Sequence, residues 1–185
     1  MAVKLGKVRK AIGEYDHILI MMRHAQAEPG SLTSDRGRGL TDKGRKQAKT
    51  VAKGLLDLGV NPDRIICSGA QRAVETCERM LKVFGDGPKV DYRQSLYDGG
   101  MQAILDELGH IKPQTRSALV LGHEPVMSIA SQWMADSQSD PSLIDLLNLG
   151  FSTASIAVFG SDTPLGEWQL HSGRLLAVIS PKDFD

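Results

Sequence analysis

The sequence has only two cysteines among its 185 residues, and it has no excess of charge of either sign. Cys67 and Cys77 cannot build a disulfide framework and do not form a close metal-ligand pair, so we expect both to be buried thiols. Lys and Arg number 22, as do Asp and Glu, whereas binding to nucleic acid or a membrane surface needs a basic excess. We therefore expect no nucleic-acid or membrane partner, and any anion site must be local.

Long apolar runs are also missing, and none could cross a bilayer. The basic segment Met1–Lys10 is followed by Gly13, Glu14 and Asp16 rather than by the apolar core of a signal peptide. The sequence therefore predicts a cytoplasmic protein in which residues 1 to about 16 are a basic tail. The length suits one compact domain that spans residues 1–185.

Apolar runs alternate with helical patterns along the rest of the chain. The continuous apolar run at residues 17–22 is typical of a strand buried on both faces. Further strands are expected at residues 64–67, 89–92, 118–121, 155–159 and 175–179. Helices are expected from the N-cap Thr41 to about Gly59, after Ser68, at 100–108 and at 126–134. This order predicts an α/β fold, a three-layer sandwich whose central, mainly parallel sheet is flanked by helices.

Polar clusters follow three of the expected strands: Arg23-His24, Ser68 with Arg72, and His123 after a glycine. Each has an ordinary explanation alone: a strand end in solvent, a surface arginine or a loop histidine. Because ligands bind at the carboxyl ends of the strands in such sheets, we expect the three clusters to meet in one site.

Two arginines and two histidines without a metal-ligand set indicate phosphate chemistry. A guanidinium group binds phosphate oxygens in a bidentate manner. A neutral imidazole is a good nucleophile near pH 7, and nearby arginines help to keep it unprotonated. The pattern therefore predicts phosphoryl transfer through a covalent intermediate, with no metal and no cofactor.

Four segments support this interpretation by a resemblance to a known family. They are Arg23-His24-Ala25, Leu40–Ala48, Ser68–Thr76 and Gly122-His123. In the same order, they resemble the Arg-His-Gly, Leu-Thr-x-x-Gly-x-x-Gln-Ala, Ser-x-x-x-Arg-Ala-x-x-Thr and Gly-His motifs of the histidine phosphatase superfamily, also called phosphoglycerate-mutase-like. The resemblance implies that His24 is the nucleophile and that Arg23, Arg72 and His123 form the phosphate pocket, without a metal.

The sequence departs from the family pattern at two positions. Ala25 stands where the motif has glycine, which requires a negative φ at that residue. Asp98 stands where many members carry a glutamate that acts as general acid, so Asp98 is either a shorter acid or a loop residue. In the loop before Leu40, we expect Arg38 to reach the phosphate, although surface arginines are more often solvated.

The substrate depends on that acid. An alkoxide leaving group needs a proton, whereas imidazole, with a pKa of roughly 6.5, leaves without one. The chain between Asp98 and His123 is also too short for a cap over the pocket. Both features resemble the SixA-type phosphohistidine phosphatases, and they predict hydrolysis of phosphohistidine on a protein.

The same residues also have alternative interpretations. The nearest alternative is a small-molecule phosphomonoesterase of the same superfamily, with Asp98 as general acid. A non-catalytic module that binds a phosphorylated ligand is disfavoured because every pocket residue is present, and a mutase because little chain remains to enclose its substrate. A cysteine-based phosphatase is disfavoured because the spacing from Cys67 to Arg72 is one residue too short. The sequence does not predict the oligomeric state.

Overall fold

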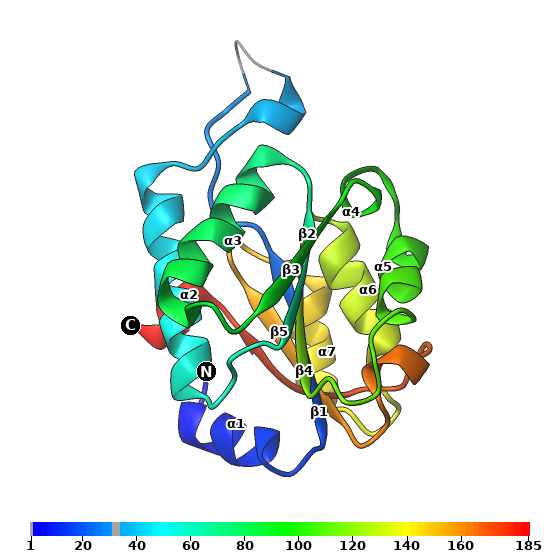
Figure 1. Ribbon diagram of the computed structural model, residues 1–185. Coiled ribbons are helices and arrows are strands. Elements are labelled where there is room, and N and C mark those ends of the chain that lie inside the picture. The colour runs from blue at the N-terminus through cyan, green and yellow to red at the C-terminus, as the bar shows by residue number, and fades with distance from the viewer. Residues whose placement is uncertain (1, 31–33) are drawn as a thin grey trace.

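The computed structural model describes residues 2–30 and 34–185, and a six-stranded sheet lies at its centre (Figure 1). The strand order is β3-β2-β4-β1-β5-β6. The strands are β1 (His17–Arg23), β2 (Arg64–Ser68), β3 (Lys89–Arg93), β4 (Ser117–Gly122), β5 (Ile156–Ser161) and β6 (Arg174–Ile179). The first four are parallel, and β5 runs antiparallel to both β1 and β6. The predicted α/β fold with a mainly parallel sheet is confirmed.

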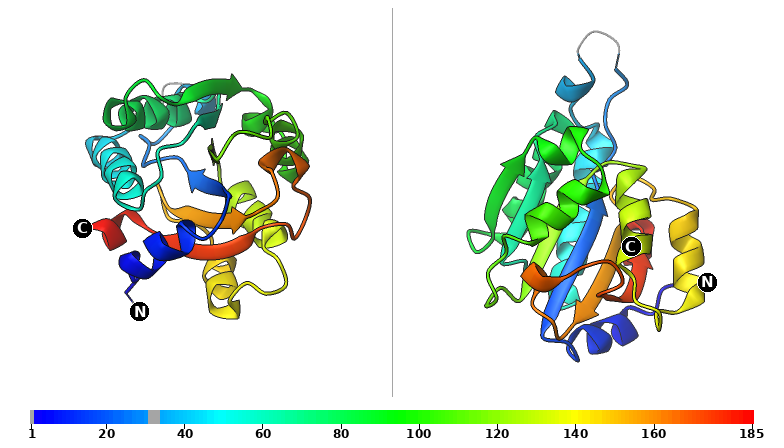
Figure 2. Two further views of the ribbon diagram at one scale, coloured as in Figure 1. Left: turned by 60° about the horizontal axis from the view of Figure 1, so that its bottom comes forward. Right: turned by 90° about the vertical axis from the view of Figure 1, so that its right-hand side faces the viewer.

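Helices cover both faces of this sheet, as the views in Figure 2 show. On one face lie α1 (Leu5–Ile12), α2 (Asp42–Asp57) and α3 (Gln71–Phe84). On the other lie α4 (Ser95–Asp98), α5 (Met101–Leu108), α6 (Val126–Met134) and α7 (Pro141–Asn148). Single 3-10 turns occur at η1 (Asp35–Gly37), η2 (Leu165–Glu167) and η3 (Pro181–Phe184). The three-layer sandwich expected from the sequence is therefore present.

Strand β1 runs through the middle of the sheet, and its alternate side chains enter two different cores. Ile18, Ile20 and Met22 pack under α1–α3, whereas Leu19 and Met21 pack under α5–α7. All five side chains are buried, and burying each contributes about 1.5–3 kcal/mol. Burial on both faces explains why this strand is a continuous apolar run rather than an alternating one.

The N-terminal segment differs from the predicted basic tail because residues 5–12 form α1. Val8 and Ile12 are buried in the core beneath α2, while the basic residues of the helix are exposed. Arg9 also donates to the carbonyl of Asp57 at the end of α2, at 2.8 Å. Because four of the first ten residues are basic, the sequence pattern did not indicate this helix, which has only a narrow apolar stripe.

Helix α2 begins as the sequence predicts. The Thr41 side chain accepts from the amide of Gly44 at 3.0 Å, and Gly59 follows the helix with φ +84°. Gly44 is required for close approach, because a Cβ there would overlap the carbonyl oxygen of Gln26. The start of α2 is thereby packed against the loop that follows β1.

Two further helix boundaries correct the sequence interpretation. Ser68 ends β2 and does not open the next helix, since α3 begins at Gln71 after the N-cap Ala70. Helix α7 was not expected, although Asp140 caps it by accepting from the amide of Ser142, and Pro141 occupies its first turn.

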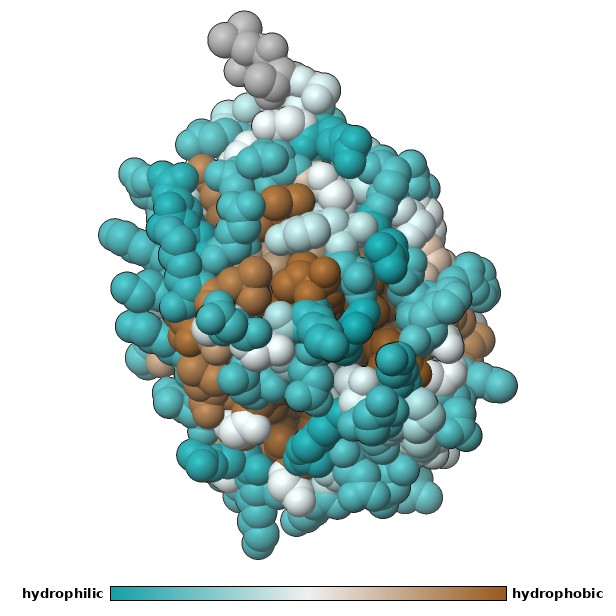
Figure 3. All heavy atoms as spheres, in the orientation of Figure 1, coloured by the Kyte–Doolittle hydropathy of each residue, from teal (hydrophilic) through white to brown (hydrophobic). Residues whose placement is uncertain are grey.

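The molecular surface around these layers is mostly hydrophilic. The face in Figure 3 shows apolar atoms gathered near its centre, where the edge strand β3 lies, within a hydrophilic surround. The exposed ends of β3 are Lys89 and Arg93, and such charges discourage edge-to-edge pairing. Within the described residues, no helix is both long and apolar enough to span a membrane.

Candidate active site

The three predicted clusters meet at the carboxyl ends of β2, β4 and β1, which are neighbours in the sheet. Arg23 is in register with Gly122, and the amide of His24 donates to the Gly122 carbonyl at 3.0 Å. The rings of His24 and His123 are then 5.2 Å apart between centroids. Parallel pairing of these strands therefore assembles the site from segments about 100 residues apart.

His24 is buried, and its two ring nitrogens have different partners. Nδ1 lies 2.7 Å from the carbonyl oxygen of Ala25, which can only accept, so Nδ1 carries the proton of the neutral ring. Nε2 then presents a lone pair, which accepts a long hydrogen bond of 3.3 Å from Arg72 Nε–H. The backbone thus selects the tautomer with a nucleophilic Nε2.

The surroundings of His24 keep this ring neutral. Burial, helped by the positive charges of Arg72 and Arg23, lowers the pKa of His24 to about 3, although its bond to the Ala25 carbonyl opposes the shift. The ring is therefore unprotonated and able to attack an electrophile across the neutral pH range.

His123 presents a proton donor to the same space. Its Nε2 lies 2.7 Å from Ser68 Oγ, which already accepts from the amide of Ala70. Among the described residues, His123 Nε2 is the acceptor that lies within reach of the Ser68 hydroxyl proton, so this proton points to Nε2 and Nδ1 of the neutral His123 ring carries the hydrogen. Burial and then Arg72 lower the pKa of His123 to about 4, so the ring stays neutral. Its Nδ1 is buried without a hydrogen-bond partner among the described residues.

Arg23 supplies a second unpaired donor. Its Nη1 donates to the carbonyl of Phe151 at 2.8 Å, while its buried Nε has no partner within the described residues. The amide of Phe151 in turn donates to the carboxylate of Glu124 at 3.0 Å. Since buried donors are almost always satisfied, Arg23 Nε and His123 Nδ1 mark where a ligand's acceptor atoms belong.

Arg72 completes the cluster from the first turn of α3. It is buried beside His24, and its Nη1 and Nη2 donate to the backbone oxygen and the carboxylate of Asp35 at 2.8 and 3.1 Å. One turn further along α3, Thr76 accepts from the amide of Ala25 at 3.0 Å. This bond ties the helix that carries Arg72 to the backbone that carries His24.

Comparison with known proteins identifies the family. A model of the histidine phosphatase superfamily (branch 1) matches residues 19–100. One solved structure is that of a protein from Nakamurella multipartita that has been proposed to be a phosphohistidine phosphatase SixA. It has a TM-score of 0.76 and 30% identity to this chain, over 89% of this chain and 96% of that chain. This chain belongs to the histidine phosphatase superfamily.

Two further phosphatases are similar to this chain. The structure of the protein histidine phosphatase SixA complexed with tungstate has a TM-score of 0.74 at 22% identity, over 91% of this chain and 99% of that one, which shows the shared fold. The serine/threonine-protein phosphatase Pgam5 of Drosophila mojavensis is 34% identical over 108 residues, 58% of this chain. The match covers 37% of that relative's length, so little more than a third of it corresponds to this chain.

Ala25 fits the histidine phosphatase site despite replacing the glycine of the motif. In the described chain, the residues other than glycine with positive φ are Ala154 and His171, so Ala25 meets the condition of a negative φ. Its side chain is fully buried in the core under α2 and α3. A methyl group therefore packs there without backbone strain.

The two remaining predicted site residues lie further out. Arg38 contacts its own loop, with its guanidinium on the carboxylate of Asp35 at 3.0 Å and on the carbonyl of Glu28 at 3.1 Å. Asp98 is exposed at the end of α4 and accepts from the side chain of Gln94 at 3.3 Å. Their predicted roles in this histidine phosphatase therefore remain predictions.

Sequence reasoning missed three residues that contact or support the cluster. The ring of Tyr97 lies 5.5 Å from that of His123 and 5.9 Å from the guanidinium carbon of Arg72. Its hydroxyl donates at 2.7 Å to the carboxylate of Asp35, which also binds Arg72. Glu124 holds the loop that binds Arg23. Tyr97 and Glu124 each lie next to a motif residue in the sequence, and this position could have indicated their roles. No sequence feature indicated a role for Asp35.

Both cysteines are buried thiols, as predicted. Cys67 lies in β2, and burial raises its pKa well above the usual value for a thiol, so it is not a nucleophile at neutral pH. Among the described residues, no group of three or more His, Cys, Asp or Glu side chains is placed to hold a metal ion.

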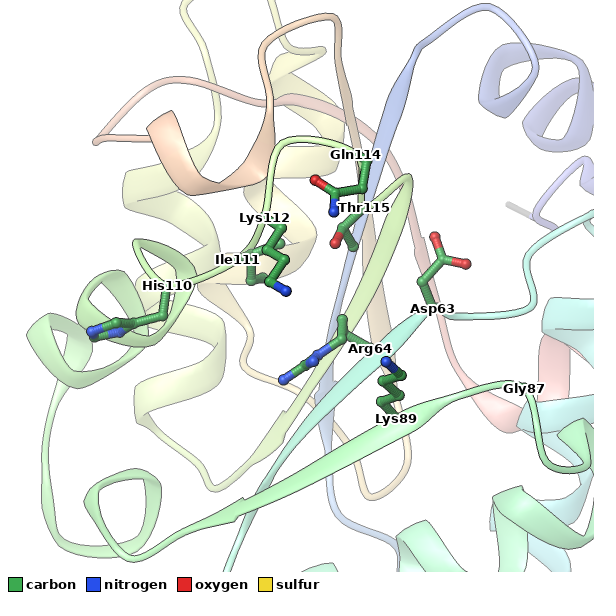
Figure 4. Close-up of a pocket in the computed structure, with 9 residues that line it drawn as sticks. All are labelled: Asp63, Arg64, Gly87, Lys89, His110, Ile111, Lys112, Gln114 and Thr115. Atoms are coloured by element: carbon green, nitrogen blue, oxygen red, sulfur yellow. The ribbon is translucent and has the colours of Figure 1, made fainter.

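A separate hollow of about 500 Å³ lies at the amino ends of β2 and β3, away from the cluster. Figure 4 shows the cationic groups of Arg64, Lys89 and Lys112 turned toward its interior. Arg64 is already paired with Asp91. Because this hollow contains none of the motif residues, the chemistry of the family belongs to the opposite end of the strands.

Proposed function

We propose that this protein is a phosphatase that hydrolyses phosphohistidine on a protein through a covalent phosphohistidine intermediate on His24. The observation that carries the proposal is the state of His24. Its Nδ1 proton is held by the Ala25 carbonyl, so Nε2 offers a lone pair beside the buried, unpaired donors of Arg23 and His123. This combination of one nucleophile and surrounding donors suits transfer of a phosphoryl group.

In the first step, the Nε2 lone pair of His24 attacks phosphorus, and the bond from phosphorus to the leaving group breaks. The leaving atom keeps that electron pair. Arg23 Nε, His123 Nδ1 and the guanidinium of Arg72 donate to the phosphoryl oxygens. Since charge spreads over these oxygens in the transition state, fixed donors lower the barrier without reorganising.

In the second step, water attacks the phosphorus of phospho-His24. Inorganic phosphate leaves, and His24 regains its Nε2 lone pair while the Ala25 carbonyl continues to hold Nδ1–H. Throughout both steps the ring keeps one orientation, because its backbone acceptor does not depend on the substrate.

The leaving group favours phosphohistidine as substrate. Asp98, the predicted general acid, pairs with Gln94 at the surface. An imidazole ring leaves without the strong acid help that an alkoxide needs. Only α5 and β4 lie between Asp98 and His123, which supports a pocket without a cap, accessible to a side chain on a protein. The description of the Nakamurella protein agrees with this substrate.

One comparison adds a further protein substrate to the test. The Drosophila relative is named as a serine/threonine-protein phosphatase, which makes phosphoserine a competitor. Small phosphomonoesters with Asp98 as acid, and binding without turnover, remain the alternatives. We also propose a cytoplasmic location, supported by the two free thiols, Cys67 and Cys77, which persist in a reducing compartment.

The test compares a phosphohistidine peptide, a phosphoserine peptide of the same sequence and a sugar phosphate, using wild type, His24→Ala and Asp98→Asn. We expect turnover on phosphohistidine, an acid-labile label trapped on His24, no activity in His24→Ala, and only a small loss in Asp98→Asn. General acid catalysis is worth roughly a hundred- to ten-thousand-fold. Rapid cleavage of the sugar phosphate with a loss of that size in Asp98→Asn would instead establish the phosphomonoesterase.

A further inference from the structure

We propose that Asp35 is a specificity residue: its carboxylate receives the positively charged imidazole ring of the substrate at the pocket mouth, and so selects phosphohistidine over O-phosphate esters. This inference rests on the proposed function. It assigns the part of the site that contacts the leaving group, for which none of the four family motifs supplies a residue.

Asp35 joins two of the elements that surround the histidine cluster. From α3, Arg72 donates to its backbone oxygen and its carboxylate. From α4, the Tyr97 hydroxyl donates to the same carboxylate oxygen at 2.7 Å, and Arg38 binds the other oxygen at 3.0 Å. The side chain is nevertheless 54% exposed. The carboxylate is therefore held in place at the rim, with surface left for an incoming group.

A bound phosphoryl group does not have to remove Asp35. The guanidinium of Arg72 has five N–H donors. Asp35 uses one on each terminal nitrogen, and Nε–H points to His24 Nε2. Two terminal N–H donors remain, so Arg72 can bind a phosphoryl oxygen while it still holds Asp35. The carboxylate then lies beside the bound phosphoryl group, on the solvent side of Arg72.

Asp35 is an anion at neutral pH. The Tyr97 hydrogen bond, and then Arg72 and Arg38, hold the pKa of its carboxyl group below the usual range. The other charged or titratable groups near this rim are Arg36, whose guanidinium lies against the Gly69 carbonyl, and the neutral rings of His24 and His123 behind Arg72. Asp35 is thus unable to protonate a leaving oxygen, but it can pair with a cation.

A fixed carboxylate beside a phosphate pocket discriminates by charge. A phosphate ester of serine brings only negative charge to this rim, so Asp35 repels it. A phosphorylated imidazole that is protonated on its other nitrogen brings a cation with an N–H donor. Hydrogen bonds between such charged partners are the strong ones, and the pair favours the protonated ring.

The protonated ring is also the form that leaves well. When His24 Nε2 bonds to phosphorus, the P–N bond breaks and its electron pair stays on the ring nitrogen. The ring leaves as neutral imidazole and retains its N–H, while the positive charge passes to the phosphorylated ring of His24. No proton is transferred in this step. An unprotonated substrate ring would have to leave as an imidazolate anion, which is a far poorer leaving group.

The experiment compares wild type with Asp35→Asn, which keeps an oxygen for Arg72 and Tyr97 but removes the charge. The substrates are a phosphohistidine peptide and 4-nitrophenyl phosphate. On the peptide, kcat/KM should fall about tenfold or more, the loss expected for a hydrogen bond to a charged group. The alkaline limb of the pH profile of kcat on the peptide should also move to lower pH, because kcat reports the ionisation of the bound substrate ring. On 4-nitrophenyl phosphate, kcat/KM should stay the same or rise.

The matched control is Asp106→Asn, which removes a carboxylate that accepts from Gln102 on the exposed face of α5 and should change neither substrate. If wild type cleaves the phosphohistidine peptide and Asp35→Asn keeps its rate and pH profile, the specificity role is wrong while the proposed function stands. An equal loss on both substrates would reduce Asp35 to a support for Arg72. If wild type does not cleave the peptide at all, the proposed function itself fails.

Discussion

At the scale of single residues, the two histidines of the site are distinguished by what binds their second nitrogen. A backbone carbonyl fixes the proton of His24 on Nδ1, and a serine hydroxyl places the proton of His123 on Nδ1 as well. One ring therefore turns a lone pair toward the pocket and the other turns a donor toward it. The same side chain performs opposite tasks because its neighbours differ.

Burial of these two neutral rings makes the stability of the protein depend on pH. The pKa is lowered to about 3 in His24 and about 4 in His123, against 6.5 in an unfolded chain. Between these values the unfolded chain binds more protons, so acidification favours unfolding. We expect the free energy of unfolding to be highest above pH 6.5 and to fall below it, by up to about 1.4 kcal/mol per pH unit for each histidine.

Denaturant titrations at a series of pH values measure this dependence. The variant His123→Asn should lose its share of the slope between pH 6.5 and about 4, while the slope of His24 remains. The exposed His110 is the matched control, and His110→Asn should leave the wild-type slope unchanged. A variant His123→Asn with the full wild-type slope would show that this ring is not buried neutral.

At the scale of elements, the loop after α7 holds Arg23 in place. Glu124 follows β4 and accepts from the amide of Phe151 and from Ser128 in α6, and the carbonyl of Phe151 accepts from Arg23. Gly150 adopts φ +79° beside the Glu124 carboxylate. Glu124 therefore positions Arg23 through the backbone of another segment.

Loss of this support should weaken catalysis without removing a pocket group. In Glu124→Ala, the amide of Phe151 loses its acceptor, which costs about 1–3 kcal/mol when the group is buried. We expect a lower melting temperature and a kcat/KM reduced by roughly tenfold, with weaker inhibition by phosphate because Arg23 is less ordered. Glu124→Gln keeps an acceptor oxygen and should restore most of the inhibition. Equal phosphate inhibition in wild type and Glu124→Ala would contradict the positioning role.

At the scale of the whole molecule, helix α1 and the histidine site lie at opposite ends of the sheet. Helix α1 packs near the amino end of β1 (Figure 1), whereas His24 follows the carboxyl end of the same strand. The core that α1 closes also contains Ala25 and the apolar side of α3. Because α1 lies at the other end of β1 from His24, a defect under α1 should still lower the stability of the fold before it disturbs the site.

Ile12→Ala tests this separation, because Ile12 is buried between α1 and the core. Replacing such a side chain by alanine typically costs about 2–5 kcal/mol. We expect that loss in chemical denaturation, with kcat/KM on the phosphohistidine peptide unchanged at temperatures where the variant is folded. Lys10→Ala, on the exposed side of the same helix, should change neither quantity. A large fall in kcat/KM of folded Ile12→Ala would show that the two ends are coupled.

Much of this architecture was predictable because it depends on residues close together in the chain. The strands follow from apolar runs, the start of α2 follows from Thr41, and the meeting of His24, Arg72 and His123 follows from the rule that parallel strands share one carboxyl edge. Helix α1 was not predictable by the same means. Its three basic residues, with Lys4 before them, resemble a solvated tail, and its two buried side chains can be recognised as core residues only in the folded chain.

The sequence by itself therefore determined the fold class, the family and the residues that converge. Only the tertiary structure decided what those residues can do there. Asp35 meets Arg72 across 37 positions and Tyr97 across 62, and Glu124 reaches Phe151 across 27. The reason is physical: a hydrogen bond depends on the distance and direction between two groups, and a pKa depends on burial and nearby charge. Both quantities exist only once distant segments have packed together.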